Sequence, residues 1–160
     1  MQLDAENLID MLVTKIGTLP DNTEIIGIHT GGAWVAERLA TCLGLNQHGT
    51  LAATLHRDDF TRRGLHPQTK STDIPFAVDG KHILLIDDVL QTGRTIRAAM
   101  NELFDFGRPQ SVTLAVLIDR GGRELPIEAE HVAMVMPLDA AQRLSLTQEN
   151  NQLRFTITES

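Results

Sequence analysis

The sequence predicts an α/β protein with a mostly parallel central sheet flanked by helices. Short apolar runs alternate along the chain with segments of helical spacing, which is the pattern of parallel sheets. The runs at 82–86 and 112–118 are continuously apolar, as expected of strands covered on both faces. Because ligands of such sheets bind beyond the carboxyl ends of the strands, the loops that follow the strands are the first candidates for a site.

Length, composition and charge favour one soluble domain over residues 1–160. No linker or repeat divides the 160 residues, and no apolar run approaches the roughly 20 residues of a membrane span. The N-terminus is acidic and polar, unlike a signal peptide, and the single cysteine, Cys42, excludes an internal disulfide. We therefore expect a cytoplasmic protein. The net charge of −7 argues against a surface built mainly to bind nucleic acid.

The N-terminal segment 4–16 is expected to form an amphipathic helix. Gly17 and Pro20 would end it, because neither continues a helix readily. The apolar residues that recur at helical spacing are Leu8, Ile9, Leu12, Val13 and Ile16.

A strand, a glycine-containing loop and a helix are expected next. The strand covers 24–28, the tight loop 29–32 and the helix 33–43, and a second strand follows at 50–56. Residues 57–75 then have no sustained period and are rich in polar and turn-forming residues. A loop of this length in a compact domain is usually functional or disordered.

Later strands are expected at 112–118, 131–135 and 153–157, and the last is half exposed because its apolar residues alternate with polar ones. A helix is expected from about 95 to 106, ended by Gly107 and Pro109. Three loops follow strands and would therefore meet at one edge of the sheet: 29–32, 87–95 and 119–123.

The residues that follow the strand at 82–86 suit a ribose 5-phosphate. Two adjacent carboxylates, Asp87 and Asp88, can accept hydrogen bonds from vicinal sugar hydroxyls. The segment Thr92-Gly93-Arg94-Thr95 offers backbone amides at a helix start, two hydroxyls and a glycine, which together suit a phosphate dianion. The alternative on these residues alone is structural, with the acids ending the strand and Thr92 capping the helix. The loop is not a Walker P-loop, because no Gly-Lys-Ser/Thr follows.

The segment 83–95, Ile-Leu-Leu-Ile-Asp-Asp-Val-Leu-Gln-Thr-Gly-Arg-Thr, resembles the motif with which type I phosphoribosyltransferases bind phosphoribosyl pyrophosphate (PRPP). A wider similarity points to the PyrR family, which comprises uracil phosphoribosyltransferases that in some bacteria also regulate pyrimidine operons. The segments that carry this wider similarity are 56–59, 72–76, 107–109 and 117–127.

The resemblance implies a type I phosphoribosyltransferase fold with a mobile flap at 57–75 and a small hood around the base. It assigns the ribose hydroxyls to Asp87 and Asp88. It also implies a catalytic role for these two acids and for Arg57, which stands at the start of the flap. The flap also carries Arg62, Arg63 and Lys70, which suit a polyanionic leaving group. The substrate-binding residues implied by the resemblance are Thr30, Gly31, Gly32, Asp87, Asp88, Val89, Leu90, Gln91, Thr92, Gly93, Arg94, Thr95 and Arg120.

Within this set the resemblance gives each segment a role. Thr30–Gly32 would face the pyrophosphate, Thr92–Thr95 the 5-phosphate, and Arg120 the nucleotide. The implied reaction converts uracil and PRPP to UMP and pyrophosphate, with Mg²⁺ bound to PRPP rather than in a dedicated protein site. The family also suggests a homo-oligomer, with a dimer as its unit. A related transferase that uses another base stays open, because base recognition often depends on backbone groups.

The sequence departs from the family pattern in two places. Family members carry Thr-Arg-Gly in the pyrophosphate loop, whereas Gly31 stands in the middle position here. The family members that bind RNA have a basic N-terminal segment, whereas 4–17 holds Lys15 as its one basic residue. Phosphate contacts dominate RNA affinity. The sequence therefore favours the enzyme and leaves an RNA-binding attenuation regulator of pyrimidine genes as the alternative.

Overall fold

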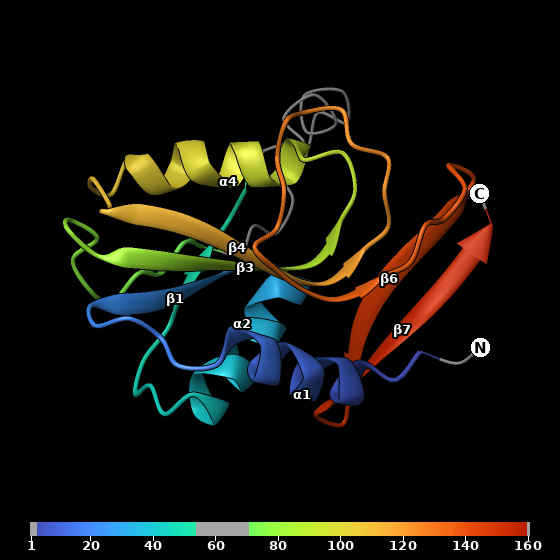
Figure 1. Cartoon of the computed structure of the whole chain (residues 1–160), viewed down its shortest axis with the longest axis horizontal. Helices are drawn as coiled ribbons and strands as arrows, with labels where there is room; N and C mark the ends of the chain where they lie inside the picture. The colour runs from blue at the N-terminus through green and yellow to red at the C-terminus, as the bar shows by residue number, and fades with distance from the viewer. Residues whose placement is uncertain (1–2, 54–70, 160) are drawn as a thin grey trace.

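A five-stranded, fully parallel sheet forms the centre of the protein in a computed structural model that describes residues 3–53 and 71–159 (Figure 1). Its strands lie in the order β2-β1-β3-β4-β5, so the predicted parallel sheet is confirmed. The bounds are Thr23–Ile28 for β1, Gly49–Leu51 for β2, His82–Leu90 for β3, Ser111–Asp119 for β4 and His131–Val135 for β5. Most of the expected flap, with Arg57, Arg62, Arg63 and Lys70, lies outside the described residues.

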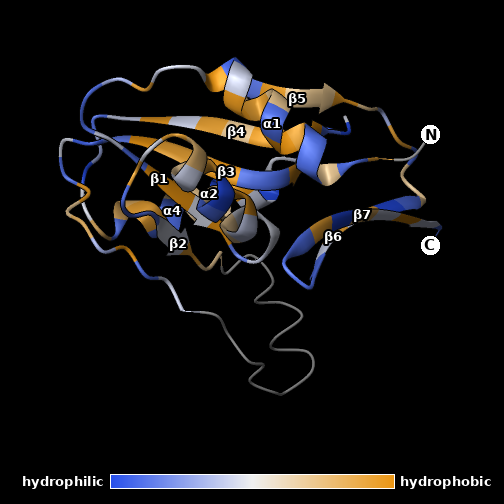
Figure 2. Ribbon diagram, turned by 90° about the horizontal axis from the view of Figure 1, so that it is seen from below, coloured by the Kyte–Doolittle hydropathy of each residue, from blue (hydrophilic) through white to orange (hydrophobic). Residues whose placement is uncertain are grey.

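Helices cover both faces of the sheet (Figures 1 and 2). Two of them, α1 (Ala5–Ile16) and α2 (Gly31–Cys42), pack on one face, and α4 (Arg94–Phe104) packs on the other. Each face has its own apolar core, because alternate side chains of the buried strands point to opposite sides. None of the helices in the described part of the chain is long and apolar enough to span a membrane.

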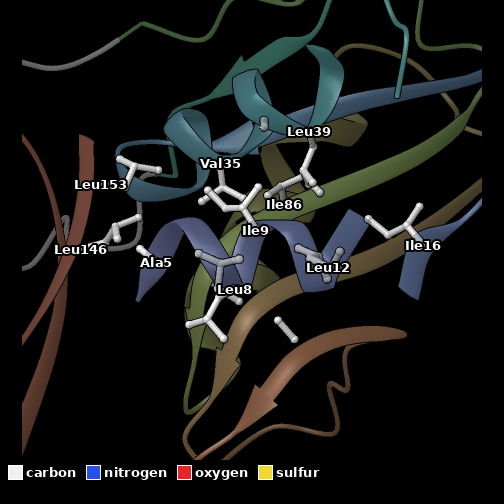
Figure 3. Close-up of a cluster of buried hydrophobic side chains, with 14 of the residues drawn as sticks. Ala5, Leu8, Ile9, Leu12, Ile16, Val35, Leu39, Ile86, Leu146 and Leu153 are labelled. Carbon is white, nitrogen blue, oxygen red and sulfur yellow. The ribbon is translucent and has the colours of Figure 1, made fainter. Parts of the chain in front are cut away.

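The first helix forms where its apolar spacing predicts. The side chain of Asp4 caps its start by accepting a hydrogen bond from the backbone N–H of Asn7, at 3.2 Å. Gly17 ends it with a φ of 67°, a backbone conformation that glycine adopts without strain. Its buried side chains face α2 and the sheet, and Figure 3 shows them: Ala5, Leu8, Ile9, Leu12 and Ile16.

The strand β3 continues four residues beyond its apolar run. Asp87, Val89 and Leu90 pair in register with residues of β4, so the acid pair lies within the strand instead of following it. Conversely, β2 ends at Leu51, and the described residues after it, Ala52 and Ala53, are not in a strand. The expected strand at 50–56 is therefore shorter within the described residues.

The C-terminal strands form a separate antiparallel hairpin (Figure 2), of which the sequence predicted only the second strand. The hairpin consists of β6 (Gln142–Glu149) and β7 (Gln152–Glu159). Asn150 and Asn151 connect the strands with φ values of 52° and 63°, as in a two-residue type I′ turn. The inner face of the hairpin packs beside α1 and α2 through three buried side chains, Leu146, Leu153 and Phe155.

Candidate active site

A pocket of about 200 Å³ lies at the carboxyl end of β3, beside the start of α4. Its position agrees with the rule that parallel sheets bind ligands beyond the carboxyl ends of their strands. The wall also includes a side chain from β6, so the hairpin takes part in the site. The residues that line the pocket are Asp87, Val89, Leu90, Gln91, Thr92, Gly93, Thr95, Ile96, Arg120 and Leu144.

The two acids differ in their surroundings. Asp87 is 7% exposed, and burial, followed by the negative charge of Asp88, raises the pKa of Asp87 well above its ordinary value of 3.8. Its Oδ1 accepts a hydrogen bond from the backbone N–H of Asp88 at 2.9 Å. Asp88 in turn accepts one from the N–H of Val89 at 2.8 Å. These two backbone contacts orient both carboxyl groups at the end of the sheet.

The start of α2 lies directly against the acids because its first two residues, Gly31 and Gly32, are glycines. The helix therefore begins two residues earlier than the sequence predicted. A Cβ at Gly31 would stand 2.2 Å from Oδ2 of Asp88, and a Cβ at Gly32 would stand 2.4 Å from the carbonyl oxygen of Ile86. Any side chain at these positions would therefore displace the loop or the acid. The structure thus places Gly31 against Asp88 and Gly32 against the carbonyl of Ile86, although neither glycine lines the pocket.

The segment 92–95 forms the start of α4. Gly93 has a φ of 93°, which favours glycine, and the hydroxyl of Thr92 accepts a hydrogen bond from the N–H of Arg94 at 3.1 Å. The carbonyl of Thr92 accepts two further bonds, from the N–H groups of Glu124 and Leu125 at 2.9 and 3.0 Å. A helix N-terminus held in this way presents positive electrostatic potential. It is a suitable site for an anion.

Arg94 and Arg120 contribute differently from one another. The guanidinium of Arg94 pairs with Glu124 at 2.7 Å and does not line the pocket. Arg120 is 4% exposed and lines the pocket. Its Nη2 donates to the carbonyl of Asp139 at 2.9 Å, while its Nε has no hydrogen-bond partner in the described residues. A buried guanidinium without a carboxylate partner is costly, so the pocket favours a ligand that supplies acceptors.

Arg123 holds the segment after β4 in place, a role that its position in the sequence did not reveal. It contacts both oxygens of Asp119 at 2.9 and 2.6 Å and donates to the carbonyl of Gln91 at 3.1 Å. The hydrogen bonds from Arg123 lower the pKa of Asp119, so this pair is ionised at neutral pH. Through its bonds to both residues, Arg123 joins Asp119 at the end of β4 to Gln91, which precedes the 92–95 segment.

The structure brings together most, but not all, of the residues that the sequence proposed. Two residues that line the pocket were not proposed from the sequence. Leu144 was missed because β6 was not predicted as a strand, and Ile96 was placed in the predicted helix at 95–106 without a role in the site. The proposed residues that line the pocket are Asp87, Val89, Leu90, Gln91, Thr92, Gly93, Thr95 and Arg120. Those that do not line it are Thr30, Gly31, Gly32, Asp88 and Arg94, and Arg57 lies outside the described residues.

Comparison with known protein structures supports the fold. A purine phosphoribosyltransferase from Pyrococcus horikoshii has a TM-score of 0.62 at 20% identity, and the match covers 82% of each chain. A hypoxanthine-guanine phosphoribosyltransferase from Bacillus anthracis has a TM-score of 0.64 at 17% identity, covering 85% of this chain and 81% of that one.

Comparison with known sequences identifies the family. The model of the phosphoribosyl transferase domain matches residues 6–142. The Bifunctional protein PyrR of Ralstonia nicotianae is 49% identical, with 98% of this chain and 94% of the relative covered. The protein of the same name from Pseudomonas aeruginosa is 53% identical over 79% of this chain and 75% of the relative. The chain therefore belongs to the PyrR family of type I phosphoribosyltransferases.

Proposed function

We propose that this phosphoribosyltransferase converts uracil and PRPP to UMP and pyrophosphate. The observation that carries the proposal is a pocket that brings together a buried acid, a helix N-terminus and a buried, incompletely paired arginine. These groups suit the hydroxyls, the 5-phosphate and the acceptor atoms of one nucleotide. The family resemblance and the PyrR relatives support uracil as the base.

The acids suit the ribose, because carboxylates accept hydrogen bonds from vicinal hydroxyls. Loss of pyrophosphate gives the ribose oxocarbenium character, and a fixed carboxylate nearby stabilises that positive charge. The orientation of Asp87 and Asp88 by backbone N–H groups means that little reorganisation is needed during the reaction. We assign the ribose hydroxyls to these two residues.

The two anionic groups of PRPP suit different parts of the site. The start of α4, with Thr92, Gly93 and Thr95 in the pocket wall, suits the 5-phosphate. The glycine loop Thr30–Gly32 approaches Asp88 and suits the pyrophosphate, which would meet backbone N–H groups at the start of α2. We assign the expected flap, with Arg57, to the exclusion of water from the activated sugar.

Magnesium fits this set of donors. The two carboxylates supply hard oxygen ligands, and the described residues hold no cluster of three or more His, Cys, Asp or Glu that would form a separate metal site. Asp87 and Asp88 would hold the ion together with oxygens of PRPP. Bound there, magnesium would neutralise charge on the leaving pyrophosphate.

The test of the enzyme is the formation of UMP from uracil and PRPP with Mg²⁺, with cytosine, hypoxanthine and guanine as alternative bases. We expect UMP to form and the purine bases to give no product. Turnover of hypoxanthine or guanine in preference to uracil would refute the assignment of the base.

The second candidate function is RNA-dependent regulation of pyrimidine genes, which the word "bifunctional" in the names of the relatives favours. In α1, Lys15 donates to the carbonyl of Val132 at 2.9 Å, and Glu6 pairs with Arg38, so this helix presents few cations that could meet phosphates. We expect no tight, sequence-selective binding when pyrimidine leader RNA is titrated at physiological salt. Nanomolar binding with a steep salt dependence would establish the regulatory function beside the enzyme.

A further inference from the structure

Gln91 occupies the position between the two halves of the candidate site. It follows Leu90, the last residue of β3, and precedes the 92–95 segment at the start of α4. Its neighbours along the chain are therefore groups that suit the ribose on one side and the 5-phosphate on the other. Gln91 also lines the pocket, as do Asp87, Thr92 and Gly93.

The backbone of Gln91 is fixed from two sides. Its carbonyl accepts a hydrogen bond from Nη1 of Arg123 at 3.1 Å. The carbonyl of the preceding residue, Leu90, accepts one from the N–H of Arg120 at 3.0 Å. Hydrogen bonds from the segment that follows β4 thus fix the backbone from which the side chain of Gln91 extends.

The side chain of Gln91 lies against the backbone of Gly122. A Cβ added to Gly122 would stand 3.3 Å from Cγ and 3.7 Å from Nε2 of Gln91, so the absence of a side chain there leaves room for the glutamine. Gly122 has a φ of 88°, which favours glycine for a second reason. Gln91 therefore packs against the backbone of Gly122, at the pocket that it lines.

The side-chain amide of the half-buried Gln91 has no partner among the described residues. Its Oε1 and Nε2 make no hydrogen bond within the part of the chain that the structure describes, although its backbone and neighbours are well bonded. A primary amide offers one acceptor and one donor side by side. This pair is complementary to an imide edge, where a ring N–H stands beside a carbonyl.

We propose that Gln91 determines base specificity by pairing with the imide of uracil, its Oε1 accepting from N3–H and its Nε2 donating to an adjacent carbonyl. The inference rests on the proposed function, because it names the base read at the same site. Arg120 offers donors only, so it suits the other carbonyl of the base and does not replace the acceptor of Gln91. Leucine at position 91 would keep most of the volume and remove both hydrogen-bonding groups.

The experiment compares the binding of UMP and N3-methyl-UMP to the unaltered protein and to Gln91→Leu, by calorimetric titration. We expect the unaltered protein to bind UMP about tenfold more tightly, as one buried hydrogen bond implies, and Gln91→Leu to bind both ligands within about twofold of each other. UMP methylated at C5 controls for added bulk, because it keeps N3–H. Gln110→Leu, at an exposed turn, is the matched control and should behave like the unaltered protein.

Two results would overturn the inference. One is a preference for UMP over N3-methyl-UMP that persists in Gln91→Leu or is missing from the unaltered protein. The other is an equal loss of PRPP and UMP binding in Gln91→Leu, which would assign the side chain to the structure of the loop. If uracil is not converted but UMP binding depends on Gln91 as expected, the proposed reaction fails and the inference stands.

Discussion

Asp87 is a carboxyl group held in a place that opposes its ionisation. Its pKa lies above the ordinary 3.8 because of burial, with Asp88 adding repulsion. Between that value and the raised pKa, the folded state binds more protons than the unfolded state, so stability falls as the pH rises through this window. At pH values above the raised pKa, the full loss of stability caused by ionising the buried carboxyl is present. The residue thus lowers stability at pH values above the ordinary pKa of a carboxyl group, while it offers its carboxyl oxygens to a ligand.

Asp87→Asn should therefore raise the stability of the unliganded protein at pH 7 and abolish most of its activity. Asparagine keeps an oxygen for the N–H of Asp88 but carries no charge. We expect a gain of at least about 1 kcal/mol, or about 2–4 °C in Tm, and a loss of activity by orders of magnitude. Thermal unfolding from pH 4 to pH 8 measures the first effect. The gain should shrink at the acidic end, and a constant gain would contradict the titration of Asp87.

Gly31 controls the acid beside it through the space that it leaves. A Cβ at residue 31 would stand only 2.2 Å from Oδ2 of Asp88, so the carboxyl group uses the space that the glycine leaves. Because that oxygen is the end of a flexible side chain, an added methyl group would turn the carboxyl away at little cost to the fold. The family resemblance places an arginine at this position in other members, which must hold the acid differently.

Gly31→Ala should reduce kcat/KM at least tenfold while changing Tm by no more than about 2 °C, since it moves a ligand-binding group and leaves the core intact. Steady-state kinetics and thermal unfolding provide the two measurements. Asp88→Asn alone and the double variant form the control. If Gly31 acts through Asp88, the double variant should be no worse than Asp88→Asn. Additive losses would show that Gly31 acts independently.

At the scale of elements, Glu6 joins the hairpin to the helices. One oxygen pairs with Arg38 of α2, and the other accepts from the N–H of Leu153 in β7 at 3.0 Å. Arg38 also donates to the carbonyl of Asn151 in the hairpin turn. Because Leu144 of the same hairpin lines the pocket, these contacts affect the shape of the site from a distance.

Glu6→Ala should lower the free energy of unfolding by about 1 kcal/mol, because the N–H of Leu153 loses its acceptor and Arg38 loses its carboxylate partner. We also expect faster hydrogen exchange in β6 and β7 than in the unaltered protein, with β3 unchanged, since only the hairpin loses an anchor. Exchange measured by mass spectrometry tests this. The control is Glu102→Ala, on α4 and away from the hairpin, which should leave the exchange of β6 and β7 as it is.

The elements that the sequence predicted well are those with buried periodicity. Only one arrangement buries the apolar faces of α1 and α4 together with the apolar runs of β3 and β4. Tertiary pairing decides the rest. The strand β3 extends through its acids because β4 offers partners as far as Asp119, and β6 has only Leu144 and Leu146 in a polar stretch. The Asn150-Asn151 pair was the available sign of that hairpin.

At the scale of the whole molecule, the site was predictable where it is local in sequence. The acids near the end of β3 and the 92–95 segment at the start of α4 are close neighbours in the sequence, so their order along the chain fixes their proximity. The contributions of Arg123 and Leu144 were not predictable, because they depend on where distant segments return to the pocket. The contact of Gly31 with Asp88 likewise joins residues 57 positions apart.

The expected flap gives a prediction about the whole molecule. Protease cleavage within 57–75 should be rapid without ligand and at least several-fold slower with PRPP and Mg²⁺, because the cationic side chains would pair with pyrophosphate. Timed digestion followed by mass spectrometry measures the cleavage. Arg57→Ala should reduce turnover more than Arg63→Ala, since only Arg57 lies in the segment that resembles the family. Equal cleavage with and without ligand would separate this loop from catalysis.

The packing of α1 has a consequence for the order in which the protein can assemble. This helix is synthesised before β4, β5 and β7, yet it packs against all three strands. On the ribosome its apolar side chains (Figure 3) can meet α2 early, whereas their partners in the sheet and the hairpin begin only at Ser111 of β4. Contacts so distant slow folding and leave apolar surface exposed meanwhile. A nascent chain that stops before β5 should consequently bind chaperones through α1.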